Sequence, residues 1–190
     1  SVPMVLVPAE AKLVRRALQA AKIPFSERSA GGYIIVFGIQ PPKRSGGVVA
    51  LSEVSGASAW GSQDAKLAVD GDRSTRWGTG SPQRPGMAFE VRFRRPIELA
   101  GIEYDIGRWP HDSPRGLQVE LVHADGSRHV VLDPEDYAAF RYLYQMNSGF
   151  RFDFPAEEAV GVILTQTGKD GRMDWSIGEL QFVGAAHGAE

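Results

Sequence analysis

A short acidic segment, VDGDRSTRW at residues 69–77, carries the side chains best suited to chemistry. It places two carboxylates, Asp70 and Asp72, on either side of Gly71, and two hydroxyl residues follow them. Calcium is bound in proteins by about six to eight oxygen atoms from carboxylates, hydroxyls and backbone carbonyls, and Gly71 allows the sharp turn that would direct carbonyls inward. The segment therefore predicts either a calcium loop or an Asx turn ahead of a strand.

Two other interpretations of this segment are disfavoured by its spacing. An EF-hand loop needs glycine at its sixth position and glutamate at its twelfth, whereas Thr75 and Ser81 stand there. Acid–base catalysis by two carboxylates requires environments that shift their pKa values apart, but Asp70 and Asp72 share one turn. No histidine lies near them in the sequence. We therefore expect no catalytic role for this pair.

Composition excludes several classes of function for the 190 residues. Lys and Arg number 21 against 23 Asp and Glu, so the charge balance gives no case for binding nucleic acid. The chain has no cysteine, which excludes disulfides and cysteine–zinc sites. No apolar run approaches the roughly 20 residues of a membrane helix, and we expect no signal peptide. A hydrophobic content of 43% allows a sizeable core.

Residues 1–40 predict a small strand–helix–strand unit. Apolar residues recur at helical spacing over 8–21, and YIIVF at 33–37 is typical of a buried strand, with a polar loop containing Gly31 and Gly32 before it. A unit of this size is too small to be stable alone. We therefore expect it to dock on the rest of the chain through its apolar residues, namely Leu13, Leu18, Ile34 and Val36.

After a predicted linker at residues 41–47, the helical pattern gives way to alternation. MAFEVRF at 87–93 alternates apolar and polar residues, and Asp125-Gly126 separates two further strands in the pattern typical of a hairpin. About eight strands joined by turn-rich loops predict a two-sheet antiparallel sandwich over residues 48–184, with a tail at 185–190. We expect a helical turn within 134–146.

Three segments of this region together resemble a known family. AKLAVDGDRSTRW at 65–77, followed by the strand MAFEVRF, resembles the signature of discoidin domains, also called coagulation factor V/VIII C-type domains, which include the family 32 carbohydrate-binding modules. WSIGELQFVG at 175–184 and VELVHADGSRHVVL at 119–132 are similar to further strands of that family. The resemblance covers about residues 48–184. It implies an all-β-dominated, eight-stranded antiparallel jelly-roll sandwich of the galactose-binding-like type, here with a small N-terminal α/β appendage.

The same resemblance implies one structural calcium ion in the acidic segment. Asp70 would bind it directly, and Glu179 would supply a second carboxylate from the last strand. The ion would thus clip an early loop to the end of the domain. The resemblance gives the remaining ligands as the hydroxyl and carbonyl of Thr75 and the carbonyls of Leu67, Asp72 and Gly178. Trp77 and Trp175 are expected to be core residues.

A candidate ligand site lies in RWPHDSPR, residues 108–115. Members of the family bind sugars, lipids or proteins with loops at one end of the sandwich, and sugar sites combine an aromatic face with a few polar groups. We expect segments 78–86 and 167–175 to form neighbouring walls, with Trp60 as a further candidate. The alternative is a stiff surface loop without a ligand. The predicted ligand-binding residues are Trp109, His111, Asp112 and Arg115.

The order of elements along the whole chain carries a second resemblance. AKLVRRALQAAKI, then YIIVF, then a linker into a domain with WSIGEL near its end resemble the soluble C-terminal part of bacterial multi-pass membrane glycosyltransferases. This implies an extracytoplasmic location, periplasmic or at the cell surface, with a tether to the inner membrane. The membrane-embedded remainder of its own chain would be its partner, and the catalytic carboxylates would lie outside this sequence.

These inferences together predict a non-catalytic module that binds a glycan or the sugar end of a lipid-linked carrier. We expect this fragment to have no enzymatic activity of its own, because no carboxylate pair across a cleft can be assembled from these loops. The alternative is a purely structural or protein-interaction domain with no glycan ligand.

Overall fold

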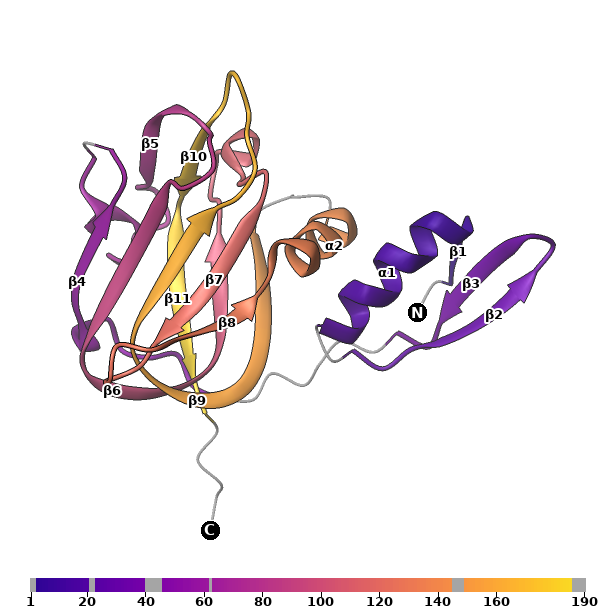
Figure 1. The fold of residues 1–190 in the computed structure, drawn as a ribbon, viewed down its shortest axis with the longest axis horizontal. Helices are drawn as coiled ribbons and strands as arrows, with labels where there is room; N and C mark the ends of the chain where they lie inside the picture. Colours follow the sequence, from indigo (N-terminus) through magenta and orange to yellow (C-terminus); the bar gives the residue numbers. More distant parts are fainter. Residues whose placement is uncertain (1–2, 21–22, 40–45, 62, 145–148, 186–190) are drawn as a thin grey trace, which may run out of the picture.

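The computed structural model describes residues 3–20, 23–39, 46–61, 63–144 and 149–185. Residues 41–45 of the predicted linker and 186–190 of the predicted tail lie outside the described residues. The chain forms a small N-terminal unit beside a larger β-sandwich, as Figure 1 shows.

The N-terminal unit has one helix on a three-stranded antiparallel sheet of order β1-β3-β2. The prediction of a polar loop before YIIVF is wrong, because residues 26–30 form a strand. Gly31 and Gly32 have φ angles of 57° and 82°, which suit a two-residue hairpin turn and so bring this segment alongside YIIVF. The elements of the unit are β1 (Met4–Leu6), α1 (Pro8–Ala20), β2 (Ser26–Ala30) and β3 (Tyr33–Phe37).

The N-terminal unit contacts the sandwich through helix α1, which packs on helix α2 (Pro134–Tyr144). Leu18 and Val36 are buried in a core that belongs to the unit itself, while Leu13 is 38% exposed. The expected apolar docking is therefore wrong for these residues, because the small sheet already covers that face of α1. Arg16 of α1 instead pairs with three carboxylates at the start of helix α2, those of Asp133, Glu135 and Asp136. These carboxylates raise the pKa of the Arg16 guanidinium.

The sandwich contains the eight antiparallel strands that the alternation predicted. The predicted fold class is thus confirmed. Helix α2 (Pro134–Tyr144) replaces the single helical turn expected there, and short 3-10 helices span Leu51–Glu53, Ala65–Ala68 and Pro110–Asp112. The strands are β4 (Val54–Ala59), β5 (Trp77–Pro82), β6 (Ala88–Asp105), β7 (Leu117–Val122), β8 (Arg128–Leu132), β9 (Gly149–Gln166), β10 (Asp174–Ile177) and β11 (Glu179–Gly184).

Two long strands, β6 and β9, join the layers of the sandwich. Each has 18 residues, and their pairing shifts register between Arg92 and Ile97. The first part of β6 pairs with β4, and its second part pairs with β11. Strands β7 and β8 extend the sheet beyond β9, while β5 and β10 pair with each other. Strands β6 and β9 curve at one end of the sandwich, so this one pair of strands contributes to both of its layers (Figure 1).

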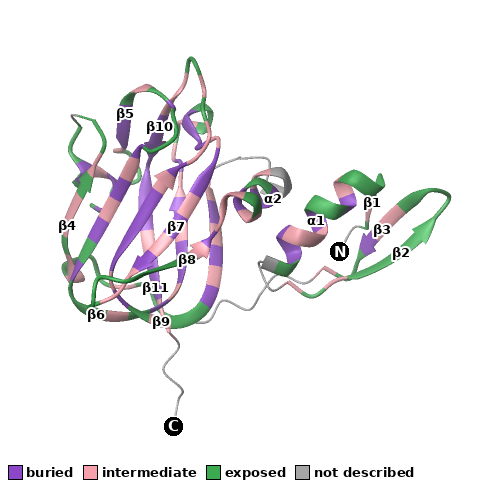
Figure 2. Cartoon of the chain, viewed as in Figure 1, coloured by how far each residue is buried: buried purple, intermediate pink, exposed green. Residues whose placement is uncertain are grey.

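The strands of the sandwich carry many buried residues (Figure 2), and the core that these form between the layers is rich in aromatic side chains. Trp77 and Trp175 are fully buried, which confirms their predicted core role, and their rings meet edge to face at 5.1 Å. Trp175 donates its indole N–H to the Tyr104 hydroxyl at 2.9 Å. Burial raises the pKa of that tyrosine well above its usual range. The buried side chains of Trp77 and Trp175 thus anchor strands β5 and β10 to the core.

Candidate functional site

The acidic segment forms a compact loop in which one hydroxyl lies among three acceptors. The Thr75 Oγ1 lies 2.9 Å from the Asp70 Oδ2, 2.8 Å from the Asp72 carbonyl oxygen and 3.3 Å from the Leu67 carbonyl oxygen. A hydroxyl carries one proton, so it cannot satisfy all three acceptors at once. The loop therefore concentrates more oxygen lone pairs than donors at this point.

Two Asx turns hold the loop in this shape. The Asp72 N–H donates to the Asp70 Oδ1 at 2.8 Å, and the Ser74 N–H donates to the Asp72 Oδ1 at 2.9 Å. Hydrogen bonds from Ser74 lower the pKa of Asp72. The turn proposed as the alternative to a calcium loop is thus present, and it uses the Oδ1 atoms. It leaves the Asp70 Oδ2 facing Thr75.

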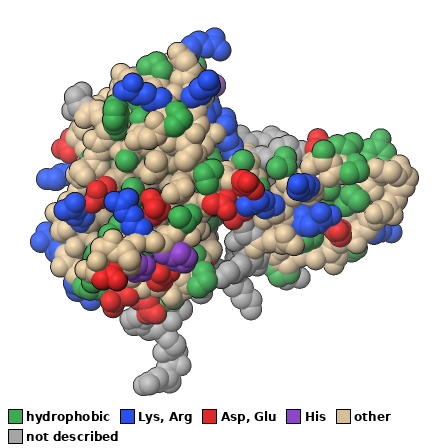
Figure 3. All heavy atoms as spheres, in the orientation of Figure 1, with side chains coloured by type: hydrophobic (Ala, Val, Ile, Leu, Met, Phe, Trp, Pro, Cys, Tyr) green, Lys and Arg blue, Asp and Glu red, His purple; other side chains and the backbone are tan. Residues whose placement is uncertain are grey.

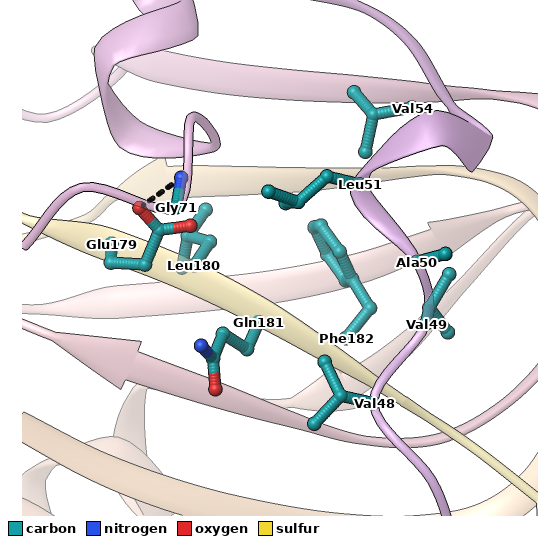
Figure 4. Close-up of a pocket in the computed structure, with 10 residues that line it drawn as sticks. All are labelled: Val48, Val49, Ala50, Leu51, Val54, Gly71, Glu179, Leu180, Gln181 and Phe182. Carbon is teal, nitrogen blue, oxygen red and sulfur yellow. Dashed lines mark hydrogen bonds between the residues drawn. The ribbon is translucent and has the colours of Figure 1, made fainter.

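Glu179, the first residue of β11, comes from the far end of the chain to meet this loop. Its side chain is almost completely buried, at 1% exposed. The Oε2 accepts the Gly71 N–H at 3.1 Å, whereas the Oε1 has no hydrogen-bond partner (Figure 4). Burial raises the pKa of Glu179 to about 7, opposed by the Gly71 N–H and reinforced by the charge of Asp70. An unpaired buried carboxylate oxygen of this kind is costly unless a cation or a proton joins it.

The surroundings explain why Glu179 is so strongly desolvated. It lies at one end of a cavity of about 250 Å³ with mainly apolar walls, among them Leu51 and Phe182 (Figure 4). Gly71 has a φ of 82°, and a Cβ there would lie 2.8 Å from the Leu51 side chain. Another residue at position 71 would therefore have a strained backbone, and the Leu51 side chain would have to shift to make room for its Cβ.

The six predicted metal ligands differ in where the structure places them. Five of them lie in the loop or on Glu179, where the contacts above bring them together. Gly178 donates its N–H to the Asp105 carbonyl oxygen at 2.9 Å, which holds it against the end of β6. Within the described part of the chain, no three His, Cys, Asp or Glu side chains form a metal cluster. A cation here would therefore need backbone carbonyls and the threonine hydroxyl in addition to the carboxylates of Asp70 and Glu179.

A second polar network, which no sequence motif indicates, ties together the loops at the end of the sandwich. Gln83, which is 2% exposed, donates its amide to the carbonyl oxygens of Ser113 at 3.0 Å and Asp174 at 2.7 Å. Its own Oε1 accepts from the Arg115 N–H at 2.9 Å and from the Gln166 side chain at 2.6 Å. Gln83 thus fixes loops from three parts of the chain.

The structure divides the four predicted ligand residues into two kinds. Asp112 is buried and pairs with Arg76, and burial raises its pKa. Arg115 donates a hydrogen bond from its Nε–H to the Asp170 carboxylate at 2.8 Å, and its other guanidinium N–H groups donate to the backbone carbonyls of Ser113 and His111. Backbone N–H groups and Arg115 lower the pKa of Asp170 to about 2. Both predicted polar residues are therefore engaged within the protein and shape the loop.

The other two predicted ligand residues, Trp109 and His111, differ in their exposure. His111 is exposed and Trp109 is half-buried. The Arg76 guanidinium lies 4.8 Å from the centre of the Trp109 ring, a distance typical of a cation–π contact. At this end of the sandwich, Lys and Arg side chains lie beside hydrophobic ones (Figure 3). The Arg76 guanidinium thus orients the Trp109 ring. Gln83 holds the same loop through hydrogen bonds to Ser113 and Arg115.

Comparison with known proteins identifies the fold. No family model and no curated protein match the sequence. Among solved structures, the family 32 carbohydrate-binding module of C. perfringens NanJ, in complex with galactose, has a TM-score of 0.56 at 18% identity, covering 71% of this chain and 96% of that one. The corresponding module of AlyQ, in complex with 4,5-unsaturated mannuronic acid, has a TM-score of 0.53 at 16% identity, covering 68% and 95%.

A third similar structure is a family 32 module from a family 31 glycoside hydrolase of Clostridium perfringens. Its TM-score is 0.50 at 17% identity, covering 72% of this chain and 94% of that one. Identities this low establish a shared architecture only. The chain has the galactose-binding-like, discoidin-like jelly-roll fold of these carbohydrate-binding modules.

Proposed function

We propose that this chain is a non-catalytic carbohydrate-binding module that takes a sugar residue at the loops around Trp109. The observation that carries the proposal is the fold shared with family 32 modules, two of which hold galactose or an unsaturated mannuronic acid. The half-buried Trp109 and the exposed His111 beside it support the proposal. An indole can stack on the apolar side of a sugar ring, while His111 supplies hydrogen bonds to its hydroxyls.

Titration of the ¹⁵N-labelled chain with galactose and with mannuronic acid tests this proposal. We expect chemical-shift changes centred on residues 107–116, with a dissociation constant near the millimolar range that corresponds to about 4 kcal/mol. Trp109→Ala should abolish them. A broad glycan screen in which no sugar perturbs these amides would instead favour the structural or protein-interaction alternative, which the internal engagement of Asp112 and Arg115 supports.

The proposal includes a structural calcium ion in the acidic loop. The orphan Glu179 Oε1 and the three acceptors around the Thr75 hydroxyl support it, because a cation would satisfy them together. The Asp70 and Glu179 carboxylates would hold the ion with the Thr75 hydroxyl and the carbonyls of Leu67 and Asp72. Its role would be to fasten the loop to β11 rather than to take part in a reaction.

The setting of the module is also proposed. The order of elements supports an extracytoplasmic domain of a membrane glycosyltransferase-like protein, with a lipid-linked sugar as one possible ligand. None of the helices in the described residues is long and apolar enough to cross a membrane. Fractionation of cells that express the full-length gene, with protease added to spheroplasts, tests this setting. Protection of this region from external protease would contradict it.

A further inference from the structure

A groove crosses the outer face of the large sheet, away from the loops around Trp109. Its volume is about 420 Å³, which lies within the range of small-ligand sites. Trp60 stands at the end of β4 and lines it, and Arg128 at the start of β8 lines it as well. We call this the sheet-face groove.

The strand register places the residues of the sheet-face groove on one side of the sheet. Directly opposed residues in an antiparallel pair share a face. Ser58 opposes Glu90, and Ala88 opposes Thr165. The Trp60 N–H donates to the Ala88 carbonyl oxygen at 2.8 Å. The alternate residues, such as Phe89, point into the core. The floor of the groove therefore combines short side chains with those of Glu90 and Ile163, and a tryptophan lies at one end.

The residues that line the groove come from strands that lie far apart in the sheet. Strands β6, β9, β7 and β8 lie side by side in that order (Figure 1), so the backbone of β8 at Arg128 lies three strand spacings from β6, about 14 Å at about 4.8 Å for each spacing. The register aligns Arg128 with Arg92, so Arg128 is also displaced along the strands from Ala88. An occupant that touches both ends of the groove must be an extended molecule that crosses the strands.

The chemistry of the lining suits a carbohydrate. Trp60 is 42% exposed, and the Arg84 guanidinium lies 4.8 Å from its ring centre, which holds the indole in place. Glu90 is oriented by a 2.7 Å contact with Arg92. Hydroxyl, carboxylate and guanidinium groups along the floor provide the mixed donors and acceptors that sugar hydroxyls need, and the aromatic side chain provides a stacking surface.

We propose that the sheet-face groove binds an extended oligosaccharide chain, with one sugar residue stacked on Trp60 and others crossing the strands toward Arg128. This inference rests on the proposed glycan-binding function but concerns a separate surface. A chain could contact the groove and the loops around Trp109 independently, which would give the module a preference for polymers over single sugars.

The test compares galactose with defined hexasaccharides from galactan, polygalacturonate and mannuronan, titrated into the whole ¹⁵N-labelled chain. We expect at least one hexasaccharide to shift the amides of Ser58, Glu90 and Thr165, which galactose alone leaves unmoved. Trp60→Ala should weaken that hexasaccharide roughly tenfold, and Arg128→Gln about threefold. Lys12→Gln, which removes one positive charge from the exposed surface of α1, is the matched control and should change nothing.

The outcomes separate this inference from the proposed function. Trp109→Ala should leave the response of the sheet-face groove in place. If every hexasaccharide shifts only the amides of residues 107–116 and Trp60→Ala has no effect, the groove proposal is overturned while the glycan-binding function stands. If no saccharide perturbs either region, both are overturned. Melting curves of the Trp60→Ala chain exclude unfolding as the cause of lost binding.

Discussion

The Gln83 network and the acidic loop both tie loops to strands with buried polar groups, but they differ in one respect. Every polar atom of the Gln83 side chain has a partner within the protein, whereas Glu179 keeps one buried oxygen without any. The pKa values of two carboxylates show the difference. That of Asp170, which Arg115 joins to the Gln83 network, is lowered to about 2, whereas that of Glu179 is raised to about 7. A satisfied network needs no ligand, whereas an unsatisfied one leaves a buried oxygen that a proton or a cation would satisfy.

The largest expected effect of breaking either network comes from Gln83→Ala. The substitution removes the partners of two carbonyls, one backbone N–H and the Gln166 side chain, and each buried polar group left unsatisfied costs about 1–3 kcal/mol. We expect a loss of about 4 kcal/mol in the free energy of unfolding, measured by urea denaturation. Gln118→Ala, on the partly exposed outer face of β7, is the control and should cost under about 0.5 kcal/mol. Equal effects would mean that the network contributes nothing special.

The pH dependence of stability sharpens the contrast between the two carboxylates. In the presence of chelator, Glu179 binds its proton more tightly in the folded state, so its contribution to stability is present below pH 4.5 and is lost as the pH rises toward 7. The loss should be on the order of 3 kcal/mol. Asp170 acts in the opposite direction, because its contribution is lost as the pH falls from 3.8 toward 2. Urea unfolding of the wild-type chain and Glu179→Gln from pH 2 to 8 measures both.

Glu179→Gln should flatten the curve between pH 4.5 and 7 and leave the acid limb unchanged. A curve for the substituted chain that still falls over that interval would show that another group titrates there.

Calcium should remove the difference between the two networks. An ion that binds only the folded state stabilises by about 2.7 kcal/mol at a hundredfold excess over its dissociation constant. For a chain of this size the melting temperature should then rise by roughly 5–10 °C between chelator and millimolar calcium. Asp70→Asn should remove the rise, while Asp64→Asn, outside the ligand set, should keep it. An unchanged melting temperature in the wild-type chain would leave only the Asx turns.

The smallest effect on stability is expected at the end that the Gln83 network supports. Trp109→Ala should cost under about 1 kcal/mol because Trp109 is only half-buried, yet it should abolish sugar binding in the titration above. Trp77→Ala is the comparison, since a fully buried tryptophan should cost roughly 3–5 kcal/mol. Thermal melts of both variants decide the matter. If Trp109→Ala unfolds the domain, the loop is architecture rather than a binding site.

The sequence by itself determined the strands of the sandwich and the side chains that fill it. Alternation in MAFEVRF placed Phe89 and Val91 in the core because side chains on a strand point to opposite faces in turn. Periodicity gave less at residues 26–30, where SERSA has no apolar alternation. That segment became a strand only because the Gly31-Gly32 turn brings it alongside β3.

Tertiary structure alone decided which candidate side chains are free to act. The residue types in RWPHDSPR suggested four ligand groups, but the partners of Asp112 and Arg115 are Arg76 and Asp170, which lie 36 and 55 residues away in the chain. Gln83 could not be recognised from PQRPG, because its role depends on three loops that meet only in the folded chain. Local sequence fixes periodicity and turn chemistry, whereas hydrogen-bond partners and desolvation are set by contacts between distant segments.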